Sequence, residues 1–71
     1  MIVMSTQHMR GSGRDLVAER ARHGLRVVDV ARAMGVSPSR IAAIEASWRP
    51  TLAVSVRYID ALRAAIERER E

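Results

Sequence analysis

The sequence predicts an all-α fold, a single small bundle of short helices. Apolar residues recur at spacings of three and four along most of the chain, which is the spacing that gives a helix one apolar face. Glycine and Ser-Pro steps divide this pattern into short segments, as expected where helices end and begin. The chain has 71 residues, which allows one domain.

Composition excludes several classes of function. The chain has no cysteine, so it has neither disulfides nor thiolate zinc sites. No apolar run approaches the roughly 20 residues that span a bilayer, and the apolar opening Met1–Met4 is too short for a secretory signal. We expect a cytoplasmic protein. Its two isolated histidines and the absence of a catalytic motif predict no metal, no cofactor and no enzymatic activity.

The positive charge is concentrated in the first fifty residues. The net charge is +4 at pH 7, and residues 1–50 hold eight arginines against four acids, whereas residues 51–71 hold four of each. A basic part beside a neutral part predicts that the first binds a polyanion and that the second has a different task. The alternative is a basic surface that serves solubility alone.

The first two helices follow a short arm. Gly11-Ser12-Gly13 predicts a flexible arm over residues 1–13, from which Arg10 and Arg14 can reach DNA phosphates, although a frayed terminus is the other interpretation. The first helix is predicted from Asp15 to His23, with Ser12 or Asp15 as its cap and Gly24 as its stop. The second is predicted over 27–34, where Val27, Val30, Ala31 and Met34 share a face.

The stretch "GVSPSRIAAIE", residues 35–45, predicts a tight turn and a third helix. Ser37 is a good N-cap, and Pro38 fits the first helical position because its missing N–H is not needed there. Ile41 and Ile44 point toward the interior, which leaves small residues on the outer side. Two helices joined by a turn of three or four residues predict a helix-turn-helix.

The last helix begins after Pro50, with Thr51 as its cap. It carries two adjacent apolar stripes, and we expect one to face the domain and the other a partner. The alternating charges of 67–71 predict a solvated tail, so the folded domain is expected over 14–66. One stripe holds Leu52, Val56, Ile59, Leu62 and Ile66, and the other holds Val54, Tyr58, Ala61 and Ala65.

Residues 14–62 resemble the Cro/C1-type (XRE) helix-turn-helix family. The resemblance implies a compact bundle of four to five helices, the lambda repressor-like DNA-binding domain, which binds operator DNA as a dimer. It also implies an ion pair between Arg20 and Glu45. It rests on the string Arg20…Gly24-Leu25…Val30-Ala31…Met34-Gly35-Val36-Ser37…Ile41…Ile44-Glu45 and on Leu52…Arg57-Tyr58-Ile59-Asp60-Ala61-Leu62.

Three positions depart from the family's pattern. Arg26-Val27 stands where the family has Ser or Thr followed by Gln, which predicts a poor cap. Ala46-Ser47 replaces the usual Asn-Gly, so the turn after the third helix is expected to be altered. Ser55 replaces a leucine, which either weakens the packing of the last helix or reassigns that face.

The resemblance also implies which residues contact DNA. Arg40 is the only long donor on the outer side of the third helix, and a guanine contact and a phosphate contact are both open for it. Ala42 and Ala43 either touch a thymine methyl group or leave room. The predicted DNA-binding residues are Arg14, Arg26, Ser37, Pro38, Ser39, Arg40, Ala42, Ala43 and Arg49.

The expected function is that of a small dimeric repressor, acting on its own promoter in a phage, anti-CRISPR, restriction-modification or toxin–antitoxin operon. The alternative is a protein-interaction module, such as an antitoxin whose last helix binds a partner protein. Trp48 is expected to cover the edge of the core, to join the dimer or to touch the DNA backbone. The predicted dimer interface consists of Leu52, Val56, Tyr58, Ile59, Leu62 and Ile66.

Overall fold

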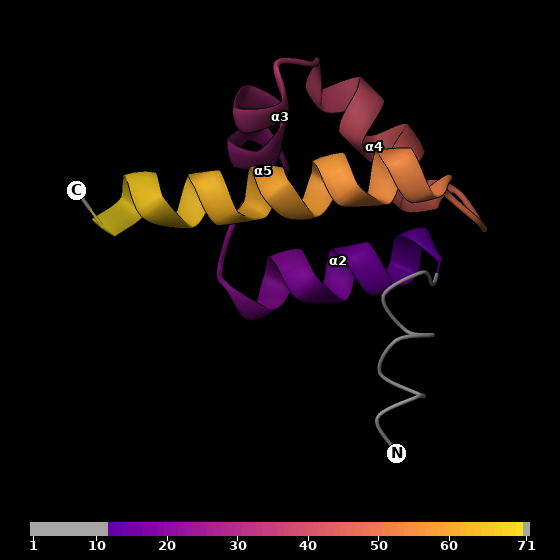
Figure 1. Cartoon of the computed structure of the whole chain (residues 1–71), viewed down its shortest axis with the longest axis horizontal. Coiled ribbons are helices and arrows are strands. Elements are labelled where there is room, and N and C mark those ends of the chain that lie inside the picture. Colours follow the sequence, from indigo (N-terminus) through magenta and orange to yellow (C-terminus); the bar gives the residue numbers. More distant parts are fainter. Residues whose placement is uncertain (1–11, 71) are drawn as a thin grey trace.

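The computed structural model describes residues 12–70 (Figure 1). They form four helices and no strand. The all-α prediction is therefore confirmed, and the expected arm up to residue 11 lies outside the described residues. The helices are α2 (Gly13–Arg22), α3 (Val27–Met34), α4 (Pro38–Ala46) and α5 (Leu52–Arg70).

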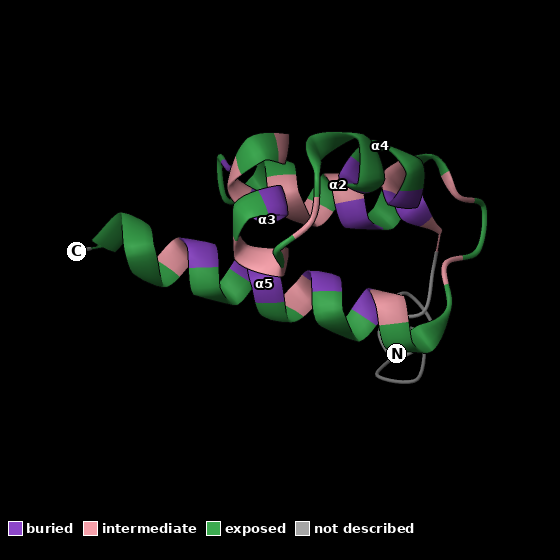
Figure 2. Cartoon of the chain, turned by 90° about the horizontal axis from the view of Figure 1, so that it is seen from above, coloured by how far each residue is buried: buried purple, intermediate pink, exposed green. Residues whose placement is uncertain are grey.

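The helices lie in two layers. Figure 2 shows α5 as one layer and the three shorter helices as the other, with the buried residues of α5 on the side that faces them. α3 packs against both α5 and α4, while α2 packs against α4 and α5. The long helix thus supports α3 and α2 directly, and α4 is held mainly by its contacts with these two helices.

α2 begins earlier than the sequence predicted. Ser12 is its N-cap, and the Ser12 N–H donates to Asp15 Oδ2 at 3.0 Å. Gly13 is buried and lies in the first turn. The assignment of Gly13 to a flexible arm is therefore wrong, because the Gly-Ser-Gly composition does not reveal a contact with a distant part of the chain.

The core is built from the predicted apolar positions. Ile41, Val30 and Tyr58 have no exposed surface, and they join the buried side chains of the other helices. Ala31 of α3 is buried in this core, and a larger side chain there would disturb the packing around α3. The other buried members are Leu16, Leu25, Ile44, Ala61, Leu62 and Ala65.

α5 begins as predicted and ends later. The Val54 N–H donates to Thr51 Oγ1 at 3.1 Å, which caps the helix, and the helix then continues through the charged segment to Arg70. Ser55 is buried on the inner side. The serine therefore leaves that face turned toward the core and does not reassign it.

The expected division of α5 into an inner and an outer stripe is only partly right. Tyr58 and Leu62, which were predicted to lie in a dimer interface, are buried inside the protomer, so this assignment is wrong. An α-helix has 3.6 residues per turn, so positions spaced three and four residues apart do not stay on one straight line along it. The later members of this stripe are therefore turned toward the core. Ile59 and Ile66 are half-buried, whereas Leu52 and Val56 remain exposed.

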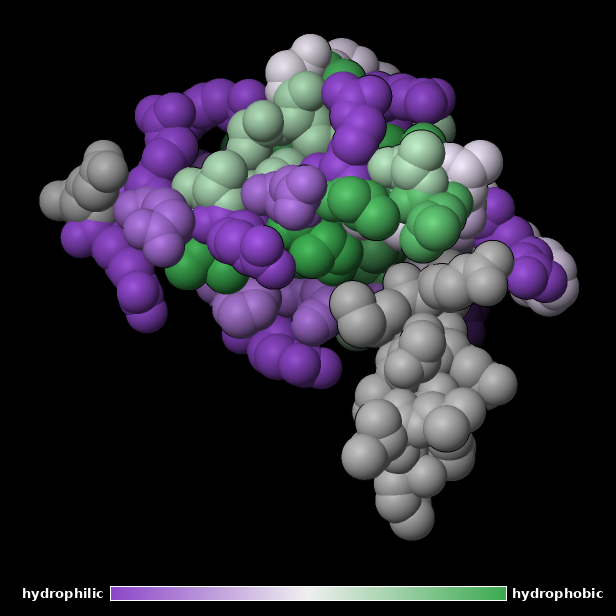
Figure 3. Space-filling view, viewed as in Figure 1, coloured by the Kyte–Doolittle hydropathy of each residue, from purple (hydrophilic) through white to green (hydrophobic). Residues whose placement is uncertain are grey.

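An exposed apolar surface covers the start of α5. Trp48 is 79% exposed, Leu52 58% and Val56 49%. The expectation that Trp48 covers the edge of the core is therefore wrong. Figure 3 shows hydrophobic side chains over the N-terminal half of α5, between hydrophilic neighbours. We call Trp48, Leu52 and Val56 the apolar surface.

Candidate nucleic-acid interface

The turn between α3 and α4 has the geometry that the sequence predicted. Gly35 adopts a left-handed conformation with φ of 74°, and the Val36 N–H donates to the Ala31 carbonyl at 3.0 Å. A side chain at this φ would be strained, which explains the glycine. The chain reverses here within three residues, so that α4 crosses α3 and packs against it.

α4 presents one buried and one exposed side. Ile41 and Ile44 are buried, and Glu45 is half-buried. The helix is thus held by its isoleucines, with its first turn open to solvent. All six residues that were predicted to contact DNA from α4 and its cap are exposed, namely Ser37, Pro38, Ser39, Arg40, Ala42 and Ala43.

The first turn of α4 is capped by Ser37, and its polar side chains are exposed. Ser37 Oγ accepts from the Arg40 N–H at 3.1 Å, which satisfies one backbone donor of that turn. The Ser37 hydroxyl hydrogen remains available for a phosphate oxygen. Arg40 is exposed, so its guanidinium can reach beyond the helix without a loss of packing.

The far end of α4 is fixed to α2 by an ion pair. Arg20 of α2 donates from Nε to Glu45 Oε2 at 2.7 Å and from Nη2 to Oε1 at 3.2 Å, so it forms the ion pair that the family resemblance implied. Its Nη1 also donates to the Leu25 carbonyl at 3.0 Å. Hydrogen bonding to Glu45 raises the pKa of Arg20 further, while burial lowers it.

The altered turn after α4 uses backbone contacts that the sequence did not predict. Ser47 is extended, with φ of −70° and ψ of 135°, so no glycine is required at this position. The Gly13 N–H donates to the Ser47 carbonyl at 2.8 Å. The start of α2 therefore lies against the end of α4. This backbone contact holds the turn after α4, which lacks the Asn-Gly that is usual in the family.

Two arginines share a groove beside α4. A hollow runs between the end of α4 and the start of α5, and Arg40 and Arg49 both line it. Val54 and Pro50 form its apolar side. Two guanidinium groups at one groove favour an anionic ligand, and the rigid fork of Arg suits a phosphate.

Arg26 and Arg14 lie outside this groove. Arg26 is the N-cap of α3, and its guanidinium already pairs with Asp29 at 3.2 Å. Asp29 also accepts from the Arg26 N–H at 2.8 Å, so the poor cap is compensated by the third residue of the helix. This pairing lowers the pKa of Asp29. Arg14 is exposed on α2, next to the turn that carries Arg49.

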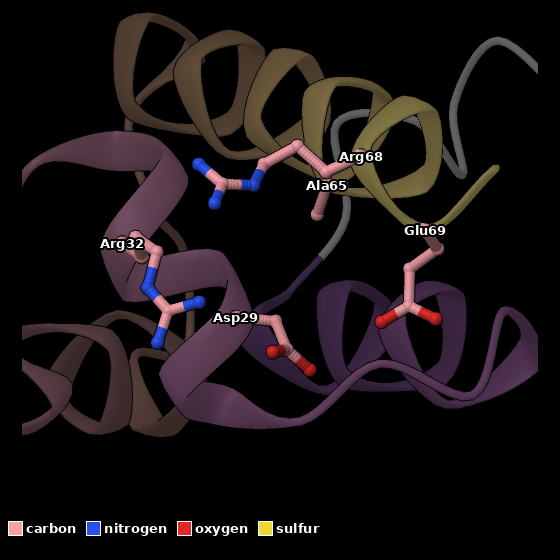
Figure 4. Close-up of a pocket in the computed structure, with 5 residues that line it drawn as sticks. All are labelled: Asp29, Arg32, Ala65, Arg68 and Glu69. Atoms are coloured by element: carbon pink, nitrogen blue, oxygen red, sulfur yellow. The ribbon is translucent and has the colours of Figure 1, made fainter. Parts of the chain in front are cut away.

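A second hollow, between α3 and the end of α5, does not suit an ion. Asp29 and Arg32 line it from α3, and Arg68 and Glu69 line it from α5 (Figure 4). Two charges of each sign cancel.

Over residues 12–70, no three His, Cys, Asp or Glu side chains are placed to hold a metal. None of the helices in this part of the chain is long and apolar enough to cross a membrane.

Comparison with protein families agrees with this geometry, although no curated protein and no solved structure matches the chain. A family model described as Helix-turn-helix matches residues 16–67, which is well over half of the chain and includes α3, the turn and α4. The chain therefore belongs to the Cro/C1-type (XRE) helix-turn-helix family of DNA-binding transcriptional regulators.

Proposed function

We propose that the protein is a small dimeric repressor that places the exposed face of α4 in the major groove of an operator. The observation that carries this proposal is the two-sided character of α4. Its isoleucines are buried, whereas the residues from Ser37 to Arg40 are exposed. Helix-turn-helix proteins read bases with the N-terminal part of this helix.

The charge around α4 supports DNA as the ligand. Between Val36 and Arg57 the only acidic residue is Glu45, and its carboxylate pairs with Arg20 on the inner side. Arg40 and Arg49 line one groove beside α4, and Arg57 is exposed in the same segment of the sequence. We expect a positive potential at this groove, which attracts a phosphate backbone and makes the binding sensitive to salt.

The apolar surface supports a second copy of the chain as the partner of α5. Leu52 and Val56 are one helical turn apart, and Trp48 precedes them in the adjoining turn. A second copy that covers these side chains would remove them from water. Two protomers would then present two α4 helices to half-sites about one turn of DNA apart. Occupied in this way, a promoter excludes RNA polymerase.

DNA selection followed by quantitative gel shifts tests the proposal. Random duplexes are enriched on the full-length protein, and the affinity for the enriched sequence is compared with that for a scrambled duplex at two salt concentrations. We expect a palindromic site, at least ~10³-fold preference over scrambled DNA, and weaker binding at the higher salt. Enrichment of no sequence would refute the proposal.

Arg40 provides the sharpest single test. If Arg40 contacts a guanine, Arg40→Ala relaxes the preference at one base position by about 1–3 kcal/mol. If Arg40 contacts a phosphate, the variant weakens binding to every operator variant equally. The measurement is a panel of single-base operator variants. Arg68→Ala is the matched control, because Arg68 lies in the last turn of α5, away from α4 (Figure 1).

A second candidate function is that of an antitoxin-like module that binds a different protein. The exposure of Trp48 favours it, since a single large aromatic side chain is a common anchor of protein interfaces. Sedimentation of the purified chain separates the candidates. A concentration-dependent dimer supports the repressor, and a strict monomer that binds DNA only with a protein encoded by a neighbouring gene supports the module.

A further inference from the structure

Glu45 lies where three helices meet. Besides the fork from Arg20 of α2, Glu45 Oε2 accepts from the Tyr58 hydroxyl of α5 at 2.5 Å. The acceptor is mostly buried, with 10% of the Glu45 side chain exposed against 16% for Arg20. The carboxylate at the end of the reading helix is therefore shared by both neighbouring helices.

The two contacts restrict different motions of α4. The guanidinium fork fixes the carboxylate to α2 alone, so it does not set the distance or angle between α4 and α5. A donor from α5 adds this restriction. Tyr58 is suited to this task because its ring has no exposed surface and is held within the apolar core, so its hydroxyl has a fixed position.

We propose that Tyr58 is a positioning residue for sequence reading, and that it sets the orientation of α4 by holding Glu45 together with Arg20. The proposal rests on the function argued above for α4. Tyr58 lies on α5, the helix that carries the apolar surface. It therefore joins the helix proposed for dimer formation to the helix proposed for base reading.

The test is Tyr58→Phe, which keeps the ring and removes only the hydroxyl. The loss of one charge-assisted hydrogen bond is expected to lower the ratio of operator to scrambled-DNA affinity about tenfold. Binding to scrambled DNA should stay within about twofold of wild type, because the arginines that meet phosphates are untouched. Leu62→Val is the matched control, since it weakens the same core from the next turn of α5 without changing a polar contact.

Two measurements separate positioning from stability. A ratio that stays at the wild-type value, or that falls equally in Leu62→Val, overturns the proposal. Amide exchange over residues 42–46 tests it without DNA, and we expect faster exchange there in Tyr58→Phe than in the control. If wild type selects no DNA sequence, the repressor proposal fails. Amide exchange alone then decides whether Tyr58 positions α4, and unchanged exchange in Tyr58→Phe would refute the role of Tyr58.

Discussion

Gly13 determines how closely α2 can approach α4. A Cβ at this position would meet the carbonyl oxygens of Ile44 and Glu45 at well under 3.0 Å. These are backbone atoms that cannot turn aside as a flexible side chain would, and the Gly13 N–H is bonded to Ser47. An alanine therefore forces the start of α2 away from the end of α4.

We predict that Gly13→Ala destabilises the protein. Helix propensity alone would favour alanine by about 1 kcal/mol, whereas overpacking against rigid atoms costs about 1–3 kcal/mol. With the hydrogen bond to Ser47 also strained, we expect a net loss of about 1–2 kcal/mol. Urea denaturation of the variant and of wild type measures the difference, and a stabilised variant would contradict the close contact.

Gly35 is the matched comparison because it is a glycine for a different reason. Its φ of 74° disfavours any side chain, yet no neighbouring atom lies within 4 Å of the position that a Cβ would occupy. Gly35→Ala is expected to cost about 1 kcal/mol through the backbone alone. The two variants thus separate a steric cost from a conformational one.

The ion pair between Arg20 and Glu45 predicts how single and double substitutions at these two positions change the stability of the fold. Glu45→Ala removes the acceptor of Arg20 Nε and Nη2 and of the Tyr58 hydroxyl, and Arg20→Ala leaves the mostly buried carboxylate without its cation. A buried partner left alone costs about 3–5 kcal/mol, and partial exposure here reduces that cost. We expect each single change to destabilise more than the double change does. Denaturation of the three variants completes this cycle, and a neutral Glu45→Ala would contradict it.

At the scale of elements, the contact between α4 and α5 makes the stability of the fold decrease at alkaline pH. Burial, and then the hydrogen bond to Glu45, raises the pKa of Tyr58 well above its ordinary value of 10.0. The unfolded chain ionises this tyrosine near pH 10, while the folded chain keeps it neutral. The stabilisation is therefore fully present below pH 10 and is lost as the pH rises above it.

We predict that the midpoint of thermal unfolding falls more steeply above pH 10 in wild type than in Tyr58→Phe. The chain suits this measurement because it has one tyrosine, no cysteine and no lysine, which leaves few other side chains that titrate there. Circular dichroism melts between pH 8 and pH 11.5 provide the comparison. Parallel profiles would show that the hydroxyl ionises as freely in the folded protein as in the unfolded chain.

The elements that the sequence predicted well are those specified by local patterns. Ser37-Pro38, Gly35 and the two isoleucines of α4 each act within a few residues, so the bounds of α3 and the start of α4 follow from the sequence. Tyr58 and Leu62 were misassigned because the choice between two adjacent stripes depends on the angle at which α5 crosses the other helices. The Gly13–Ser47 contact joins residues far apart in sequence, and no local pattern contains it.

At the scale of the whole molecule, the two proposed tasks meet at the turn between α4 and α5. Arg40 and Arg49, which are proposed to meet DNA, lie on α4 and in this turn, whereas Trp48 of the same turn joins Leu52 and Val56 of α5 in the apolar surface. Arg26 is already paired with Asp29, so its contribution to DNA binding is expected to be smaller than that of Arg40 or Arg49. We expect the proposed dimer through the start of α5 to leave the first turn of both α4 helices exposed.

We predict that Leu52→Glu together with Val56→Glu converts the dimer to a folded monomer. Both side chains are about half exposed or more, so the charges cost little in the isolated protomer but are expensive in a buried interface. The double variant should melt within a few degrees of wild type at low concentration, sediment as a monomer, and bind a single half-site with much weaker affinity than wild type binds the full site.

Ala64→Glu is the control for added charge, because Ala64 is exposed on α5 but lies about 120° around the helix from Leu52. It should remain dimeric and bind the full site normally. The reason for measuring both assembly and DNA binding is that each half-site alone offers few contacts. Two linked half-sites multiply the affinity because the second binds at a high effective concentration. A double variant that stays dimeric would show that the interface does not lie at the start of α5. A double variant that is monomeric yet binds the full site as tightly as wild type would show that dimer formation does not contribute to operator binding.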